Sequence, residues 1–143
     1  MYKHILIPTD GSELSEKAVK HGIAIAKETK AEITGITVSM PFYVFASDAD
    51  VLAQHLYEKS TTSFANKCLN ELKNTAESAG VPCNIIHVEH TQPYQAILDA
   101  AKQEGCDLIV MASHGRRGIS AIVLGSETVK VLTHSSIPVL VYR

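Results

Sequence analysis

The sequence lacks the features that would place the chain in a membrane or on nucleic acid. No apolar run reaches the roughly 18 residues that a membrane span requires. The N-terminal residues MYKHILIPTDGS contain no long hydrophobic segment of the kind that a signal peptide carries. The formal net charge is −2, so no positive field would attract nucleic acid or anionic lipid. These absences predict a cytoplasmic protein with neither nucleic acid nor membrane as a partner.

Metal-ligand motifs and the sequence motifs of phosphoryl-transfer enzymes are also missing. The three cysteines, Cys68, Cys83 and Cys106, form no CxxC pair, and we expect free thiols in the core. His87 and His90 lie three residues apart on a predicted strand, so they point to opposite faces and do not predict a metal site. There is no GxxxxGK[ST] sequence and no kinase signature, so we expect no dedicated enzyme.

What the sequence does contain is a regular alternation of β-rich and helical stretches. Its 143 residues suit a single domain, 1–143. Strands are predicted at 3–8, 31–39, 82–89, 107–112 and 137–142. Helices are predicted from an N-cap at Ser12 to about residue 29, over 52–76 with a stop at Gly80, from a cap at Thr91 to Gly105, and over 126–134. This alternation predicts an α/β, doubly wound, Rossmann-like fold with a five-stranded parallel sheet and helices on both faces. We expect the strand order 3-2-1-4-5.

One stretch, LIVMASHGRRGISAIVLGSET at 108–128, joins a strand, a glycine loop and a helix start. The apolar run at 108–111 is typical of a buried strand. Gly115 and Gly118 lie in the loop, and Gly125 precedes Ser126 at the helix start. Glycines let the backbone approach a ligand, and the first N–H groups of a helix have no intrahelical acceptor. The stretch therefore predicts a phosphate-binding site.

The first strand also ends in a polar, glycine-containing loop, PTDGS at 8–12. Ligands of such sheets bind at the carboxyl ends of strands, where the strand order reverses. If the first and fourth strands are neighbours, both loops face one crevice.

Three elements in this order match a known family. Gly115 is followed by nine residues and then by Gly125-Ser126, the loop after the first strand contains Pro8-Thr9-Asp10 with Ser12, and the closing pattern is IPVLV at 137–141. On these residues the sequence resembles the nucleotide-binding branch of the universal stress protein family over essentially its full length. Ala112 stands where that branch has the first glycine of its motif.

The resemblance implies an adenine nucleotide, ATP or else AMP or ADP, with Mg²⁺ as a candidate companion ion. It implies that the first loop borders the adenosine, that the second strand meets the adenine and that the glycine loop wraps the ribose and phosphates. The implied site residues are Pro8, Thr9, Asp10, Val38, Met111, Ala112, His114, Gly115, Arg116, Gly118, Gly125, Ser126, Glu127 and Thr128.

Several of these residues have an alternative role. Asp10 either caps the first helix or binds ribose hydroxyls or Mg²⁺. Gly115 and Gly125 either contact the ligand or serve tight turns. One of the adjacent arginines, Arg116 or Arg117, is expected to turn toward the phosphates, and the other to lie in solvent. His114 either donates to a phosphate or packs over the loop, while Ser126 is expected to cap its helix in either case.

The final strand, predicted from Ile137 to Tyr142, is apolar and lies at a sheet edge in the predicted order. An uncovered edge of this composition invites pairing, although Pro138 limits it at the start of the strand. We therefore predict a homodimer in which two such edges pair antiparallel, an arrangement that the family resemblance also implies for many members. A monomer whose 40–60 segment or third strand covers the edge is the alternative.

Three functions remain open. The first is a regulatory module that binds ATP or a close relative, with a role in stress adaptation that comes only from the resemblance. The second is a slow nucleotide hydrolase. The third is a dimeric interaction protein with a vestigial pocket, which Ala112 favours. The aromatic residues Phe42, Tyr43 and Phe45 either form a partner surface or fold over the second helix.

Overall fold

The structure is a computed structural model that describes residues 1–44, 51–116 and 123–143. Phe45, Arg117 and Gly118, which the sequence analysis singled out, lie outside these ranges. Within them, no helix combines the length and the hydrophobicity that crossing a membrane requires.

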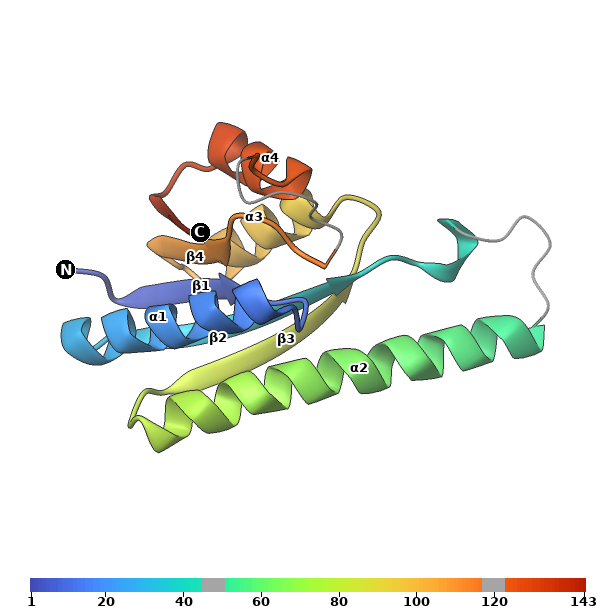
Figure 1. Cartoon of the computed structure of the whole chain (residues 1–143), viewed down its shortest axis with the longest axis horizontal. Coiled ribbons are helices and arrows are strands. Elements are labelled where there is room, and N and C mark those ends of the chain that lie inside the picture. Colours follow the sequence, from blue (N-terminus) through green and yellow to red (C-terminus); the bar gives the residue numbers. More distant parts are fainter. Residues whose placement is uncertain (45–50, 117–122) are drawn as a thin grey trace.

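Five strands form one parallel sheet in the order β3-β2-β1-β4-β5 (Figure 1). The strands are β1 (His4–Pro8), β2 (Glu32–Ser39), β3 (Cys83–Glu89), β4 (Leu108–Ala112) and β5 (Val139–Tyr142). The predicted fold class and strand order are therefore confirmed. Because β1 and β4 are neighbours, the loops that follow them leave the same edge of the sheet.

The helices cover both faces of this sheet. They are α1 (Glu13–Thr29), α2 (Val51–Ser78), α3 (Pro93–Gln103) and α4 (Ser126–His134), with a short 3₁₀ helix, η1 (Phe42–Val44), in the predicted loop after β2. Successive strand residues alternate between two cores. Ile7 and Val110 pack with α1 and α2, whereas Leu6 and Ile109 pack with α3 and α4. All three cysteines are free and buried, as predicted.

The helix boundaries confirm two predicted signals and correct two others. The Ser12 side chain caps α1 by accepting from the Ser15 N–H at 3.2 Å, and Gly80 follows α2 with φ +77°. Thr91 does not cap α3: the N-cap is Gln92, because proline at the next position fixes the start of the helix. Ser126 is not the cap of α4 either, since Gly125 occupies the N-cap position and Ser126 is the first helical residue.

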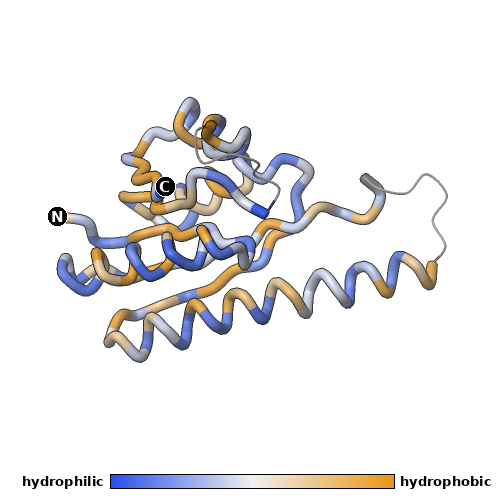
Figure 2. The backbone as a smooth tube through the Cα atoms, in the orientation of Figure 1, coloured by the Kyte–Doolittle hydropathy of each residue, from blue (hydrophilic) through white to orange (hydrophobic). Residues whose placement is uncertain are grey.

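The apolar residues of α2 are buried at one end of the helix and exposed at the other. The 28 residues of α2 span about 42 Å, whereas the seven residues of β3 span about 23 Å. The helix therefore runs past the end of the sheet (Figure 1), although apolar residues recur along its whole length (Figure 2). Leu72 is buried on the sheet, whereas Leu52 is 62% exposed and Leu56 is 57% exposed.

The aromatic residues before α2 behave differently from one another. The Phe42 ring lies 5.4 Å from the Tyr57 ring of α2, and the Tyr57 hydroxyl donates to the Met40 carbonyl at 2.6 Å. Phe42 thus folds onto the second helix, which was the alternative to a partner surface in the sequence analysis. Tyr43 does not, since it is 72% exposed.

Candidate functional site

Asp10 joins the two strand-end loops that the sequence analysis singled out. Its Oδ2 atom accepts the backbone N–H of Arg116 at 2.8 Å, and its Oδ1 atom accepts the N–H of Ser12 at 3.0 Å. Residues 9–12 and residues 113–116 are therefore held side by side, 106 positions apart in the chain. The predicted convergence of the two loops at one crevice agrees with this placement.

The environment of Asp10 keeps its carboxylate ionised. Burial by itself would raise the pKa of this carboxyl, but hydrogen bonds from Ser12 and from the Arg116 N–H outweigh it and lower the pKa below its ordinary value. Asp10 does not cap α1, since the Ser12 hydroxyl takes that position. Its two oxygens instead tie the turn before α1 to the loop after β4.

Gly115 has no room for a side chain. A Cβ atom at this position would overlap Oδ2 of Asp10, and the backbone there does not have a positive φ. Glycine is needed at position 115 because of the contact with Asp10, and not because of an unusual backbone conformation.

The first turn of α4 is fastened to the same loop. The Gly125 N–H donates to the Ser113 carbonyl at 2.7 Å, and the buried Thr128 hydroxyl donates to the Ala112 carbonyl at 3.0 Å. A Cβ atom on Gly125 would stand 3.2 Å from the Ser113 carbonyl oxygen, so close approach of two backbone segments requires this glycine. As a result, the N–H groups that open α4 lie beside the loop after β4.

Glu127 serves a neighbouring helix. Its Oε2 atom accepts the Tyr94 N–H at the start of α3 at 2.8 Å, and its Oε1 atom accepts from Lys130 Nζ at 3.1 Å. This carboxylate supplies the cap that Gln92 does not give. It also links α3 to α4, so that both helix starts lie at one end of the sheet.

Apolar residues of the predicted site share one face at the carboxyl ends of the strands. Met111 and Val38 pack with the core under α3 and α4, and Pro8 follows Leu6 on that face of β1. Thr9 points to the other face and is buried, with its hydroxyl accepting the Gly11 N–H at 3.3 Å. Its carbonyl accepts from the Thr37 hydroxyl at 2.9 Å, so Thr9 is engaged within the protein.

The sequence analysis missed that α2 reaches this site. Phe64 and Cys68 fill the space beside Gly11, and the Arg116 guanidinium lies over the Phe64 ring at 4.5 Å from its centroid. Both residues lie in the helix that the sequence predicted over 52–76. The sequence contained no signal for which loop they meet. His114, in turn, shares a hydrogen bond with the Ser113 hydroxyl at 3.1 Å.

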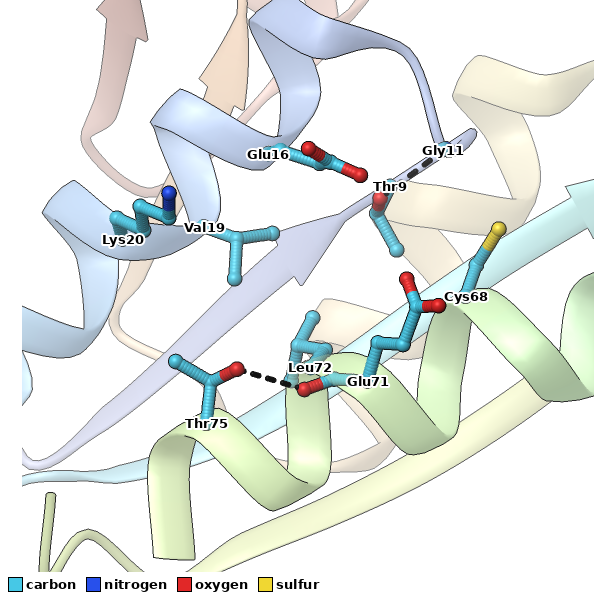
Figure 3. A pocket seen from close by; sticks show the side chains of 9 residues that line it. All are labelled: Thr9, Gly11, Glu16, Val19, Lys20, Cys68, Glu71, Leu72 and Thr75. Carbon is cyan, nitrogen blue, oxygen red and sulfur yellow. Dashed lines mark hydrogen bonds between the residues drawn. The ribbon is translucent and has the colours of Figure 1, made fainter. Parts of the chain in front are cut away.

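Two cavities adjoin the joined loops. One of about 350 Å³ lies between the start of α1 and residues 114–116, with Lys17 in its wall. The other, of about 280 Å³, lies between α1 and α2, where Cys68 and Glu71 approach Thr9 (Figure 3). Neither is lined by the apolar residues of the α3 and α4 face. Across the described ranges, no group of three or more His, Cys, Asp or Glu side chains could hold a metal ion.

Comparison with known proteins decides the relationship that the motif order suggests. The profile of the universal stress protein family matches residues 1–143. The chain belongs to this family. Universal stress protein MJ0531 of Methanocaldococcus jannaschii is 36% identical to it over 100% of this chain and 83% of its own length.

Solved structures of the family share the fold. Protein MJ0577 of the same archaeon superposes with a TM-score of 0.86 at 32% identity, over 99% of this chain and 96% of the other. A universal stress protein solved in complex with cAMP superposes with a TM-score of 0.72 at 26% identity, over 99% of this chain and 97% of the other.

Proposed function

We propose that this universal stress protein binds an adenine nucleotide, ATP or a close relative, at the carboxyl ends of β1 and β4. The observation that carries the proposal is the Asp10–Arg116 hydrogen bond, which joins both strand-end loops beside the first turn of α4. The cAMP held by a 26% identical relative supports an adenine nucleotide as the ligand class. In the cell, we assign the protein to stress adaptation as a regulatory module of the cytoplasm, where free thiols persist.

The residues at this edge suit the parts of such a ligand. Pro8, Val38 and Met111 offer an apolar wall for the adenine. Gly115 and the N–H groups that open α4 offer hydrogen-bond donors to phosphate oxygens. The Ala112 methyl group would stand beside the ribose, where the family motif has glycine. Mg²⁺, if it accompanies the ligand, would be held through the phosphates together with Asp10.

We further propose that the module binds without dedicated catalysis. Phosphoryl transfer needs a group that orients or deprotonates the nucleophile, and Asp10 and Glu127 are the carboxylates at this edge. Both oxygens of each already accept hydrogen bonds, and the lowered pKa of Asp10 makes it a weak base. A turnover assay on wild type and Asp10→Ala tests this proposal, and sustained turnover that Asp10→Ala abolishes would favour the hydrolase.

We also propose a homodimer through β5. This strand forms the free edge of the sheet beside β4, and its four residues, half-buried in one chain, are apolar or aromatic. Light scattering separates a mass near 15.5 kDa from twice that value. The Pro138 and Tyr142 carbonyls accept from Ile109 and Ser113, so the Leu140 N–H also points toward β4. Leu140→Pro therefore disrupts the pairing of β5 with the sheet and should give monomer or insoluble material. A soluble dimer that tolerates Leu140→Pro would place the interface elsewhere.

Calorimetric titration with ATP, with and without Mg²⁺, is the decisive test of binding. Heat with ATP but little with GTP is expected if the apolar wall receives adenine. Ala112→Gly restores the family motif and should leave the affinity equal or up to tenfold tighter, since tenfold corresponds to about 1.4 kcal/mol. No heat and no thermal shift at millimolar ATP would reject the proposal and favour an interaction protein with a vestigial pocket.

A further inference from the structure

The side chain of Arg116 lies on the opposite side of the sheet from the helix start where phosphates are expected. Its guanidinium stands over Phe64 of α2, and α2 packs through Leu72 on the core of Ile5 and Ile7. Helix α4 packs through Val131 on the other core. Figure 1 shows α2 and α4 on opposite sides of the sheet. In the free protein, Arg116 is thus turned away from α4.

Both partners in this contact are anchored at the first loop, although the Phe64 side chain is 38% exposed. The Phe64 ring lies against the β1 loop, with its Cζ atom 3.0 Å from the position of a Cβ on Gly11. The backbone of Arg116 is held by Asp10 at 2.8 Å. The first loop therefore positions both the Phe64 ring and the Arg116 backbone, which places the guanidinium within reach of the ring.

The Arg116 charge has no carboxylate partner among the described residues. The ion pairs found there involve His4, Lys17, Lys73 and Lys130. Asp10 accepts from the Arg116 backbone and not from its guanidinium. The aromatic face is a weak site for a cation, whereas a phosphate offers bidentate, charge-assisted hydrogen bonds.

We propose that Phe64 is a positioning residue that holds Arg116 on the α2 side in the free protein, and that the phosphates of a bound nucleotide draw the guanidinium off the ring. This inference rests on the proposed nucleotide site. Because one guanidinium cannot occupy both positions, phosphate binding competes with the contact to α2. Phe64 thereby weakens the recognition of phosphate charge and leaves the recognition of the nucleoside unchanged.

The test compares ATP with adenosine in calorimetric titrations of four variants. Phe64→Leu keeps an apolar group beside Gly11 but removes the ring, and it should tighten ATP binding about two- to fivefold. Adenosine affinity should stay at the wild-type value. Phe64→Tyr retains the ring and should match wild type. In an Arg116→Gln background, Phe64→Leu should have no effect, because the two residues act through one contact.

Leu56→Ala is the matched control, since it removes an exposed apolar side chain from the same helix and should change neither affinity. A spectroscopic readout follows the contact itself. In NMR spectra of the free protein, the ring should shift the Arg116 side-chain protons upfield. Saturating ATP should abolish that shift, whereas saturating adenosine should preserve it.

The failures are distinguishable. Absence of binding by wild type to both ATP and adenosine would refute the proposed site, and the inference with it. Binding of nucleotides with equal effects of Phe64→Leu on ATP and adenosine would overturn the inference alone. So would an unchanged ATP affinity in Phe64→Leu, or an upfield shift of Arg116 that persists in saturating ATP.

Discussion

The two loops that meet at the candidate site are held by different kinds of contact. Residues 9–12 have two internal bonds to backbone N–H groups, from Gly11 to the Thr9 hydroxyl and from Ser12 to Asp10, in addition to the bonds of the Thr9 backbone to β2. The backbone groups of Ser113 and Arg116 in the second loop bond to residues elsewhere in the chain. Ser113 donates its N–H to the Tyr142 carbonyl at 2.7 Å, and Arg116 donates to Asp10.

This difference teaches how the site is assembled. A loop whose backbone groups bond to one another is partly ordered by local contacts. A loop whose backbone groups bond to distant elements takes its conformation from the folded sheet. The first loop acts as the template, and Asp10 is the point where it sets the second. Each loop needs a glycine for a different reason: Gly11 has φ +77°, whereas Gly115 leaves space for the Asp10 carboxylate.

The largest effect is expected from a side chain in the template loop. Gly11→Ala should cost about 2 to 4 kcal/mol in the free energy of unfolding, measured by urea denaturation. Gly11 has φ +77°, and its Cβ would stand 2.7 Å from Cys68 Sγ.

Gly80→Ala is the matched control for Gly11→Ala, because Gly80 also has φ +77° but has no atom within 4 Å of its Cβ position. It should cost only about 1 kcal/mol. Equal losses in the two variants would show that packing against α2 contributes nothing at Gly11.

The second effect concerns the join between the loops. Gly115→Ala should cost about 1 to 3 kcal/mol, because its Cβ displaces the Asp10 carboxylate and breaks the bond to Arg116. Asp10→Ala vacates that space, so the cost of Gly115→Ala should largely disappear in the Asp10→Ala background. If Gly115→Ala lowered the free energy of unfolding equally in both backgrounds, Gly115 and Asp10 would act independently.

A smaller effect is expected where α4 is fastened to the second loop. Thr128→Val keeps the shape of the side chain and removes the buried donor to Ala112, which should cost about 1 kcal/mol. Thr133→Val removes an exposed hydroxyl of the same helix that donates to Val129, and it should stay within about 0.5 kcal/mol of wild type. Comparable unfolding midpoints for both variants would contradict the role of Thr128.

The smallest effect is a dependence on pH. The Asp10 pKa is lowered in the folded protein, so its ionisation stabilises the fold above the unfolded-state pKa near 4. Asp10→Asn should therefore be less stable than wild type at pH 7, by less than about 1 kcal/mol because the group is partly solvated. The difference should shrink as pH falls through the folded-state pKa. A difference that is constant between pH 7 and pH 3 would show that ionisation of Asp10 does not matter.

Much of the fold follows from local patterns. The β-rich stretches and the helical periodicity predicted the five strands and the four α-helices, and the expected strand order is confirmed. The 3₁₀ helix η1 lies in a stretch predicted as a loop. The errors lie at helix starts, where Thr91 and Ser126 are both good capping residues by type. A proline and a close backbone approach decided those two positions instead. The pattern that predicted the helix over 52–76 likewise contains no information about where the sheet ends, and therefore none about which of its apolar residues are buried.

The sequence by itself determined which residues lie in the two loops, that glycines stand at 115 and 125, and that the chain forms a parallel α/β sheet of the universal stress protein family. These are local properties of spacing and residue type. The tertiary structure alone decided that Asp10 occupies the space beside Gly115, that Glu127 caps α3, and that the Arg116 guanidinium lies over the Phe64 ring. Such contacts depend on strand order and on helix length, which bring together side chains that are tens of positions apart.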